Sequence, residues 1–368
     1  MLSSEHNKKA LLKVINSCRN GEGQMTMGFT TTAKPMTTNM KNQVETATNW
    51  PKVSIIMLNW NSIDDTRECL ESLKKVTYPN YDIIVVDNGS EGDDAKLLSS
   101  EYGSQATIIS KAENLGFPEG NNVGIRQALM KGGDFCLLLN NDTIVDPEFL
   151  SELVEVAKDP SIGAVGSKIY NYYDSNRVDS AGGNAWYWLM LFRLKGGDQD
   201  MGQFDTIVDR DFVYANSMLI KREVFEEVGL LDPDFFFGAE EYDYCIRVKR
   251  HGYRIVYVPT SKIWHKSGRC RAKLKDYPET QKLIKRKMGA GSYKYIYGLS
   301  RKHFPPVLFL IPFTSYYLFT AGPSFILGGL FGCSPTSVFR YIVRHKEVGS
   351  ITNGIRSIWR SRISKLKR

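Results

Sequence analysis

Short apolar runs alternate with helical patterns along residues 53–158. Four runs of consecutive apolar residues predict buried strands, at 53–59 (VSIIMLN), 81–87 (YDIIVVD), 107–110 (TIIS) and 135–140 (FCLLLN). A helix is predicted after each of them, at 64–74, 94–102, 121–130 and 147–158. Continuous apolar strands that alternate with helices are typical of a parallel sheet covered on both faces. The pattern therefore predicts an α/β fold.

Composition divides the chain into three regions. Residues 1–50 are polar and Thr-rich and lack apolar periodicity, so we expect a mobile polar tail that ends at Pro51. Residues 51–300 are predicted to form one α/β domain. Residues 301–368 combine basic and apolar stretches and are predicted to form a membrane-associating C-terminal region with apolar helices.

The overall composition is that of a folded protein. Of the 368 residues, 42% are hydrophobic and 24% are charged, which is enough apolar material for a real core. The six cysteines include no CxxC pair, which disfavours a zinc site or a disulfide scaffold and fits a reducing compartment. The N-terminus lacks an apolar core of the signal-peptide type, so we expect no export by that route.

Charge is distributed unevenly along the chain. Residues 1–261 carry a net charge of −11, whereas residues 262–303 carry +11. Residues 304–332 contain no charged side chain, and residues 333–368 carry +8. An acidic body followed by an apolar run between two basic flanks favours a membrane surface as partner over nucleic acid.

The apolar run 304–332 is long enough to interact deeply with a bilayer. Its 29 residues would extend ~44 Å as a helix, more than the ~20 residues that a span requires. Several prolines argue against one straight helix. A hairpin bent at Gly322-Pro323 that dips into the cytoplasmic leaflet, a single transmembrane span, and a buried or dimer-forming helix pair remain open. We expect a peripheral or monotopic protein on the cytoplasmic face of the cell membrane.

Polar clusters follow three of the predicted strands. They lie at 87–90 (DNGS), 113–125 (ENLGFPEGNNVGI) and 140–143 (NNDT). Each alone is consistent with a loop or a helix cap. Together, at the carboxyl ends of parallel strands, they predict one crevice suited to a nucleotide and a divalent cation. The absence of GxGxxG after the first strand and of GxxxxGK[ST] anywhere disfavours dinucleotide and P-loop sites.

At this point a family resemblance becomes specific. From about Val53 to about Gly268, the chain contains in order VSIIMLNWN, IIVVDNGS, ENLGFPEGNNVGI, LLLNNDT, FVYANSMLIKREVFEEVGLLDPDFFFGAEEYDYCIRVKRHGYRIVYVP and KIWHKSG. This series resembles glycosyltransferase family 2, in particular its rhamnosyltransferase-like branch. The resemblance implies a GT-A fold over residues 51–300, with a single Rossmann-like nucleotide-sugar-binding domain and a mainly parallel central sheet. It also implies a nucleotide-sugar donor, a divalent cation (Mg²⁺ or Mn²⁺) and inversion at the anomeric carbon.

The resemblance implies two metal-binding side chains. Asp142 matches the last Asp of the family's DxD motif, although Asn140 replaces the first Asp. His265 matches a position where family relatives have a His that ligates the metal or touches the diphosphate. Helix capping by Asp142 and a purely structural His265 are the alternatives.

The donor pocket is implied in the same way. Asp87 matches the family's Asp that contacts the base, and a carboxylate accepts from the imide N–H of uracil or thymine. A UDP- or dTDP-sugar is therefore favoured, although a guanine N–H would also serve. Further implied nucleotide-sugar-binding residues, which also have an alternative role as turn residues, are Asn59, Asn114, Gly116, Asn122 and Asn141.

The acceptor base is expected in GAEEYDYCIR. The family motif there is Glu-Asp-x-Asp, with its first Asp as base, and Glu241 occupies that place with one more methylene. Glu240 is the second candidate and would otherwise orient the acceptor. These residues open a predicted helix that ends at Gly252. Asp243 and Arg247 lie at i and i+4, so a surface ion pair is sufficient to explain them.

The function expected is inverting transfer of a sugar to a hydroxyl of a glycan, and the apolar region favours a lipid-linked acceptor. One alternative is a catalytically impaired sugar-nucleotide-binding or scaffold protein, suggested by Asn140 and Glu241. A nucleotidyltransferase is a further alternative, but it would need a basic Gly-rich loop where this chain has NWNSIDD. We expect no nucleic-acid partner, and a homo-oligomer remains open.

Overall fold

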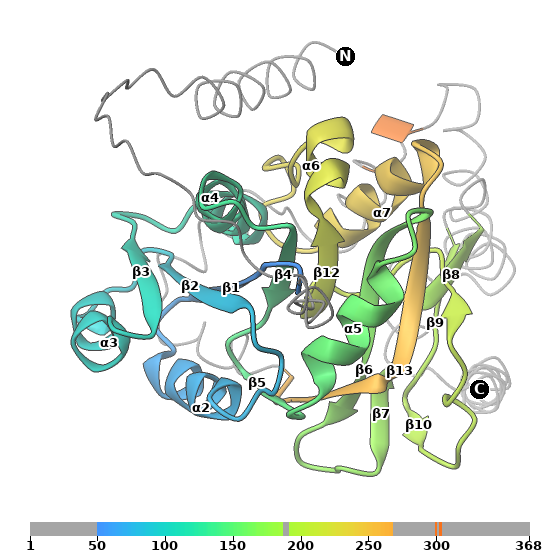
Figure 1. Cartoon of the computed structure of the whole chain (residues 1–368), viewed down its shortest axis with the longest axis horizontal. Helices are drawn as coiled ribbons and strands as arrows, with labels where there is room; N and C mark the ends of the chain where they lie inside the picture. Colours follow the sequence, from blue (N-terminus) through green and yellow to red (C-terminus); the bar gives the residue numbers. More distant parts are fainter. Residues whose placement is uncertain (1–49, 187–190, 268–298, 300–301, 304–368) are drawn as a thin grey trace, which may run out of the picture. The chain divides into compact units, whose positions relative to one another are not determined.

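The computed structural model describes residues 50–186, 191–267, 299 and 302–303. The chain divides into two compact units, residues 1–185 with 192–295 and residues 186–191 with 296–368. The first unit contains an α/β body (Figure 1). The predicted tail, apart from Trp50, and the apolar run 304–332 with most of its flanks lie outside the described residues.

The first half of the body alternates strands and helices, as the sequence pattern predicts. In chain order these elements are β1 (Val53–Asn59), α2 (Ile63–Leu73), β2 (Tyr81–Asp87), α3 (Asp94–Tyr102), β3 (Ala106–Ser110), α4 (Phe117–Met130), β4 (Phe135–Leu139), β5 (Thr143–Val145) and α5 (Phe149–Ala157). All eight predicted elements are confirmed. Helix α4 begins at Phe117 rather than at residue 121, because Pro118 is compatible with the first turn of a helix.

The second half of the body is richer in strands. Its elements are β6 (Ile162–Asn171), β7 (Arg177–Ser180), β8 (Gly183–Trp186), β9 (Leu191–Leu194), β10 (Asp198–Gln199), β11 (Val208–Asp209), β12 (Ser217–Lys221), α6 (Arg222–Val228), α7 (Glu240–Arg250) and β13 (Arg254–His265). Strands β8 and β9 form a separate two-stranded sheet.

One large sheet runs through the body in the order β10-β7-β6-β12-β4-β1-β2-β3. Strands β4, β1, β2 and β3 run parallel to one another, which confirms a parallel centre. Strand β12 is antiparallel to both β4 and β6. Strand β13 runs parallel to β6 along most of its length and also pairs antiparallel with β5. The pairing with β5 places the end of β13 at the carboxyl edge of the parallel strands.

Both faces of the sheet are covered by helices, as Figure 1 shows. Alternate side chains of β1 point to opposite faces: Ile55 and Met57 pack with residues of α2 and α5, whereas Ile56 packs with residues of α4, α6 and α7. Both clusters consist of buried side chains. The apolar strand runs are therefore continuous because each strand has two buried faces.

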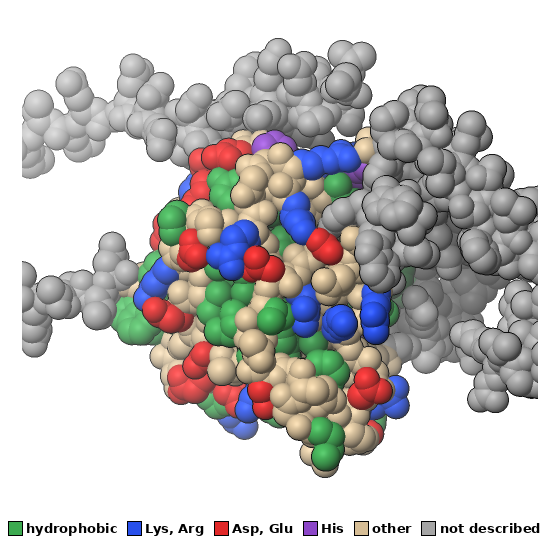
Figure 2. Space-filling view, turned by 90° about the vertical axis from the view of Figure 1, so that its right-hand side faces the viewer, with side chains coloured by type: hydrophobic (Ala, Val, Ile, Leu, Met, Phe, Trp, Pro, Cys, Tyr) green, Lys and Arg blue, Asp and Glu red, His purple; other side chains and the backbone are tan. Residues whose placement is uncertain are grey.

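One face of the body is mixed in charge. Figure 2 shows acidic and basic side chains interspersed with apolar ones on one face. In the part of the chain that the structure describes, no helix is both long enough and apolar enough to cross a membrane.

Candidate active site

The carboxyl ends of neighbouring parallel strands bring three of the predicted polar clusters together. Strands β1 and β2 are in register, so that Asn59 lies beside Asp87. Strand β4 flanks β1 on its other side, and Asn140 follows directly after its end. The predicted convergence at this edge of the sheet is therefore a property of the fold.

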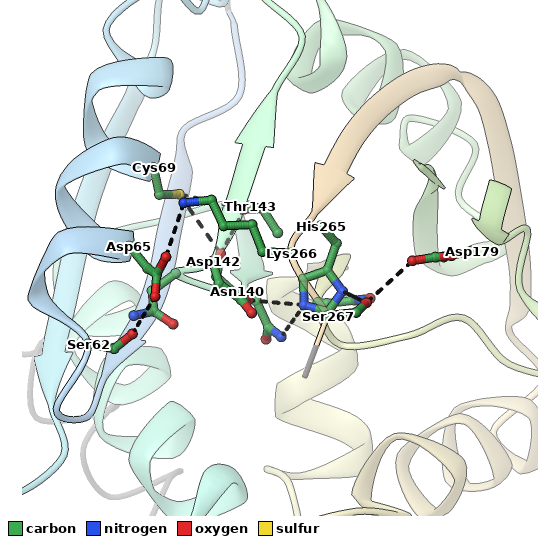
Figure 3. Close-up of polar contacts among 12 residues, drawn as sticks. Ser62, Asp65, Cys69, Asn140, Asp142, Thr143, Asp179, His265, Lys266 and Ser267 are labelled. Carbon is green, nitrogen blue, oxygen red and sulfur yellow. Dashed lines mark hydrogen bonds and ion pairs between the residues drawn. The ribbon is translucent and has the colours of Figure 1, made fainter. Parts of the chain in front are cut away.

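Asp142 and His265 meet although they are far apart in the sequence. The antiparallel pairing of β5 with β13 sets His265 opposite Thr143. The Nε2 atom of His265 then lies 3.0 Å from Oδ1 of Asp142, with both side chains largely buried (Figure 3). The backbone N–H of Lys266 donates to the Asp142 carbonyl at 3.0 Å, which fixes the two segments against each other.

The imidazole of His265 is held on both of its nitrogens. Its Nδ1 lies 2.9 Å from Oγ of Ser267 and 3.4 Å from the Asn216 amide nitrogen, and its Nε2 lies 3.3 Å from the Asn140 amide nitrogen. Rotating the Asn216 amide by 180° would let its buried oxygen, which has no hydrogen-bond partner in the described part of the chain, accept a proton from Nδ1. In that tautomer the Nε2 lone pair would be available to a cation shared with Asp142, whereas without a cation the 3.0 Å contact fits an Nε2–H that donates to the carboxylate.

This pair suits a hard or borderline divalent cation. A carboxylate oxygen is the preferred ligand of Mg²⁺, and imidazole is an additional ligand for Mn²⁺. Among the residues that the structure describes, no three His, Cys, Asp or Glu side chains gather as a metal cluster. Asp142 and His265 would thus supply two ligands and leave the other coordination positions to diphosphate oxygens and water. The donor chemistry fits the predicted cation.

Asp87 lies in a buried polar network at the end of β2. Its Oδ1 accepts from Asn59 Nδ2 at 2.8 Å and from Ser90 Oγ at 2.5 Å. Among the residues that the structure describes, its Oδ2 accepts only a long contact of 3.4 Å from the Ser90 backbone N–H. Asn59 also donates to Asp94 Oδ2 at 2.9 Å and is fully buried. Asn59 therefore orients Asp87, and Oδ2 of Asp87 is the oxygen with spare capacity to accept.

Asn114 and Gly116 shape the loop that leads into α4. The side-chain Oδ1 of Asn114 accepts from the Gly116 backbone N–H at 2.9 Å and from Asn88 Nδ2 at 3.3 Å. Gly116 has a φ of 84°, and a Cβ there would lie 2.5 Å from the Phe236 carbonyl oxygen. The following amide, Phe117 N–H, donates to that same oxygen at 2.8 Å. Gly116 thus permits a close backbone contact with the segment before α7.

Asn122 makes the second link between α4 and this segment. Its Nδ2 donates to the Leu231 carbonyl at 2.9 Å, and its Oδ1 accepts from the Leu231 N–H at 3.1 Å. The side chain is buried. Its contacts to backbone account for Asn122 structurally, and the donor-binding roles of Gly116 and Asn122 stay predictions.

Glu240 and Glu241 open α7 as a buried pair of carboxyl groups. Ala239, with a φ of 71°, precedes them and turns the chain into the helix. One oxygen of each carboxyl is buried without a hydrogen-bond partner among the described residues. Burial raises the pKa of Glu241, and burial together with the neighbouring Glu241 raises the pKa of Glu240 well above its ordinary value. A carboxylate with a raised pKa is a stronger base, which suits removal of a proton from a hydroxyl.

Comparison with known proteins agrees with this arrangement. Residues 54–229 match the family described as "Glycosyl transferase family 2". This region belongs to glycosyltransferase family 2. The predicted resemblance to family 2 is confirmed over these residues, which include the parallel strands, the Asp142 loop and β12.

Curated relatives of this glycosyltransferase domain come from bacteria and archaea. It is 30% identical over 253 residues to an uncharacterized protein, y4gI, of Sinorhizobium fredii (65% of this chain, 27% of that one). It is 29% identical over 226 residues to the O-antigen biosynthesis protein RfbC of Myxococcus xanthus (58% and 17%). It is 26% identical over 206 residues to the low-salt glycan biosynthesis hexosyltransferase Agl10 of Haloferax volcanii (55% and 63%). The matches thus span less than two thirds of each of these relatives.

A solved structure supports the fold of the glycosyltransferase domain. The crystal structure of GalNAc-T7 with UDP, GalNAc and Mn²⁺ superposes with a TM-score of 0.50 at 20% identity, covering 59% of this chain and 44% of that one. The likeness identifies an α/β GT-A-like fold.

One prediction about α7 of the glycosyltransferase domain needs correction. Asp243 and Arg247 do form an ion pair, with Nε 2.8 Å from Oδ2, but Asp243 is fully buried rather than on the surface. Arg247 also donates to the carbonyl oxygens of Val228 and Leu230 at 3.1 and 2.9 Å. The pair is buried because it fastens α7 to the end of α6. The i, i+4 spacing predicts the contact but not its depth.

The sequence patterns did not reveal the buried lysine of the site. Lys266 lies next to His265, and its Nζ contacts Asp65 Oδ1 at 3.0 Å and Glu68 Oε2 at 2.7 Å, both on α2. Figure 3 shows this lysine reaching from the end of β13 toward α2. From the sequence alone, a lysine that directly follows the end of a strand is expected to be exposed to solvent. The partners of Lys266 are about 200 residues away in the sequence. No local signal identifies such a contact.

Proposed function

We propose that this chain is an inverting glycosyltransferase that moves a sugar from a nucleoside-diphosphate sugar to a hydroxyl of a lipid-linked glycan. The observation that carries the proposal is the approach of Asp142 to His265 at the carboxyl edge of a nucleotide-type sheet. The UDP and Mn²⁺ of the GalNAc-T7 structure agree with this class of donor and cation.

The base of the donor would be recognised by Asp87. Its Oδ2 retains capacity to accept a hydrogen bond, and Asn59 holds the carboxylate in place. An imide N–H of uracil or thymine is a matching donor, which favours UDP- and dTDP-sugars. Neutralising the charge on the departing diphosphate is the chemistry that a divalent cation, held by Asp142 and His265, would supply.

The acceptor hydroxyl would be activated by Glu241. Its carboxylate takes the hydroxyl proton while the acceptor oxygen forms a bond to the anomeric carbon, and the bond from that carbon to the diphosphate oxygen breaks with its electron pair leaving on the diphosphate. Attack from the face opposite the leaving group inverts the anomeric centre. Glu240, whose raised pKa favours a neutral carboxyl group, would orient the acceptor by hydrogen bonds.

A membrane setting accords with the sequence of the C-terminal region. Residues 304–332 carry no charge and lie between basic flanks of +11 and +8. Such flanks are attracted to anionic headgroups, and an apolar run adds burial in the acyl region. We therefore place the enzyme on the cytoplasmic face of a cell membrane, where a lipid-linked acceptor is accessible.

A donor screen tests the proposal. Purified full-length protein is incubated with UDP-, dTDP- and GDP-sugars in Mg²⁺ or Mn²⁺, and release of the nucleoside diphosphate is measured. We expect slow hydrolysis of a UDP- or dTDP-sugar that depends on the cation. Hydrolysis of GDP-sugars alone would contradict the preference for uracil or thymine, because Asp87 could also accept from a guanine N–H. Absence of both hydrolysis and nucleotide binding across the panel would contradict the enzymatic function.

A further inference from the structure

Four buried side chains form a continuous hydrogen-bonded chain between the two halves of the site. Asn141 Nδ2 lies 2.8 Å from Thr66 Oγ1, and Thr66 Oγ1 lies 2.8 Å from Asn59 Oδ1. Asn59 Nδ2 then lies 2.8 Å from Asp87 Oδ1. This series of hydrogen bonds thus begins at Asn141, the residue before Asp142, and ends at Asp87, the carboxylate predicted to contact the nucleotide base.

The direction of each hydrogen bond in this chain is determined by chemistry. Asn59 faces the carboxylates of Asp87 and Asp94, which accept only, so its NH₂ group must point toward them. Its oxygen therefore faces Thr66, whose hydroxyl proton is donated to that oxygen at 2.8 Å in preference to the more distant Ser62 carbonyl at 3.2 Å. The hydroxyl lone pairs of Thr66 are left to accept from the NH₂ group of Asn141.

Burial makes the chain stiff. Thr66 and Asn59 are completely buried, and Asn141 and Asp87 are 6% and 3% exposed. Water has little access to replace a broken link, and a buried polar atom that loses its partner is costly. A shift of the Asn141 segment therefore disturbs Asn59, and a shift of Asp87 disturbs Asn141.

The same turn of α2 also holds the segment that carries His265, the second residue of the Asp142–His265 pair that would bind the cation (the cation pair). Asp65, the neighbour of Thr66, accepts from Lys266 Nζ at 3.0 Å and from Ser62 Oγ at 3.0 Å. Lys266 directly follows His265. One helical turn thus fixes three segments: the end of β1 through Thr66, the Asp142 loop through Thr66, and the end of β13 through Asp65.

We propose that Thr66 is a positioning residue that couples the nucleoside pocket at Asp87 to the cation pair Asp142–His265. This inference rests on the proposed function, since it assumes that a nucleoside and a divalent cation are the ligands. Ordering Asp87 around a base orders Asn141, and hence Asp142, before the diphosphate is engaged. Binding of the nucleoside end then strengthens cation binding, and by linkage the cation strengthens nucleoside binding by the same factor.

A nucleoside without phosphate is the appropriate probe, because it cannot touch the cation directly. The dissociation constant of Mn²⁺ for the full-length protein is measured from the electron paramagnetic resonance signal of free Mn²⁺, with and without saturating uridine or thymidine. The ratio of the two constants is the coupling factor. We expect a factor of about 5 or more for the wild type, in the usual range of coupling between sites.

Three variants isolate the hydroxyl of Thr66. Thr66→Val keeps the shape but removes the donor and acceptor, so the coupling factor should fall to about 1, while Thr66→Ser should retain it. Ser72→Ala is the matched control, because it removes another buried hydroxyl from α2 whose contacts, to Cys69 O and Val145 N, lie outside the chain. It should keep the wild-type factor. If circular dichroism shows that Thr66→Val does not fold, Thr66→Ala takes its place.

The outcomes separate this inference from the proposed function. A general loss of structure weakens Mn²⁺ binding both with and without the nucleoside and leaves the ratio of the two dissociation constants unchanged. If Thr66→Val keeps the wild-type coupling factor, the positioning role of Thr66 is wrong. An equal loss in Ser72→Ala also overturns it. A wild type that binds both ligands independently contradicts the coupling alone. A wild type that binds neither contradicts the site on which the proposed function depends, and the coupling with it.

Discussion

The imidazole Nε2 of His265 lies 3.0 Å from a carboxylate oxygen of Asp142, and the contact depends on one short strand pair. Strand β5 has only three residues, yet its pairing with the end of β13 is what brings the two side chains together. Because β13 also runs along β6 in the main sheet, the position of His265 is set by the whole second half of the body. The placement of His265 opposite the Asp142 loop therefore depends on the sheet.

Replacing Asp142 with Ala should lower sugar transfer by a factor of ~100 or more, because the cation is expected to contribute several kcal/mol at the leaving group. Chelation of the wild type with EDTA should abolish turnover, and added Mn²⁺ or Mg²⁺ should restore it. Asp64→Asn, at a carboxylate that is 80% exposed on α2, is the matched control and should transfer normally. Full activity in EDTA would remove the cation from the mechanism.

Replacing Glu241 with Gln should reduce transfer by ~10²–10⁴-fold while nucleotide binding survives, because the amide keeps the shape of the side chain but cannot accept the proton. The base must be deprotonated to act, and the pKa of Glu241 is raised. As the pH decreases, wild-type activity should therefore begin to fall at a pH above the usual carboxyl range. If Glu240→Gln is inactive and Glu241→Gln is active, the base is Glu240. Normal transfer by both variants would place the base elsewhere.

The buried Glu240 should make the fold less stable as pH rises. Its pKa in the folded protein is raised well above 4.5, first by burial and then by Glu241, so the neutral form is favoured in the fold. The stability it contributes is complete below the unfolded pKa and is lost as the pH rises through the folded pKa. Thermal unfolding from about pH 5 to about pH 8 should therefore show a smaller loss of Tm for Glu240→Gln than for the wild type. Glu148→Gln, at an exposed site, should follow the wild type, and parallel curves for Glu240→Gln would contradict the raised pKa.

Local pattern was sufficient to predict the first half of the fold. The runs at 53–59 and 81–87 coincide with β1 and β2, because a strand buried on both faces needs an unbroken apolar sequence. The predicted clusters converge because parallel strands end at one edge. By contrast, β6, β12 and β13 include glycine, lysine or serine positions that are buried, such as Lys168, whose Nζ is paired with Asp200 at 2.9 Å. Burial of such a charged residue requires an oppositely charged partner, which here comes from a distant part of the sequence.

The site was predicted as a set of residues but not as a network. Asn59 was assigned to the nucleotide by resemblance, and the structure shows it fully buried and bonded to Thr66, Asp87 and Asp94. Thr66 itself had no motif to mark it, since a threonine in the first turn of a helix is common. Hydrogen bonds between remote segments follow from packing, and periodicity carries no information about them.

The full-length chain should sediment with membranes and resist extraction by high salt. Each Lys or Arg near an anionic surface contributes about 1 kcal/mol that salt can screen, whereas burial of the uncharged residues 304–332 is insensitive to salt. Detergent should release the protein. Fractionation of cells that express the whole chain, at low and high salt and in detergent, measures this directly. Recovery of the full-length protein in the soluble fraction at low salt would contradict membrane association.

Two glycines with positive φ provide a test of how α4 positions the segment before α7. Gly116 and Gly132 have φ values of 84° and 77°, but the ψ of 170° places Gly116 in a region that is essentially restricted to glycine, so alanine there carries backbone strain of about 1–3 kcal/mol in addition to any steric conflict. A Cβ at Gly132 meets nothing within 4 Å, whereas one at Gly116 would lie 2.5 Å from the Phe236 carbonyl oxygen.

Gly116→Ala should therefore destabilise the protein by about 1–3 kcal/mol more than Gly132→Ala in urea unfolding. It must also displace Phe236, whose carbonyl accepts from Phe117 N–H at 2.8 Å, and with it the start of α7 that carries Glu240 and Glu241. Transfer by Gly116→Ala should fall even under conditions where the protein remains folded, while Gly132→Ala should transfer at the wild-type rate. Equal unfolding free energies for the two variants would show that the contact with Phe236 is not close enough to matter.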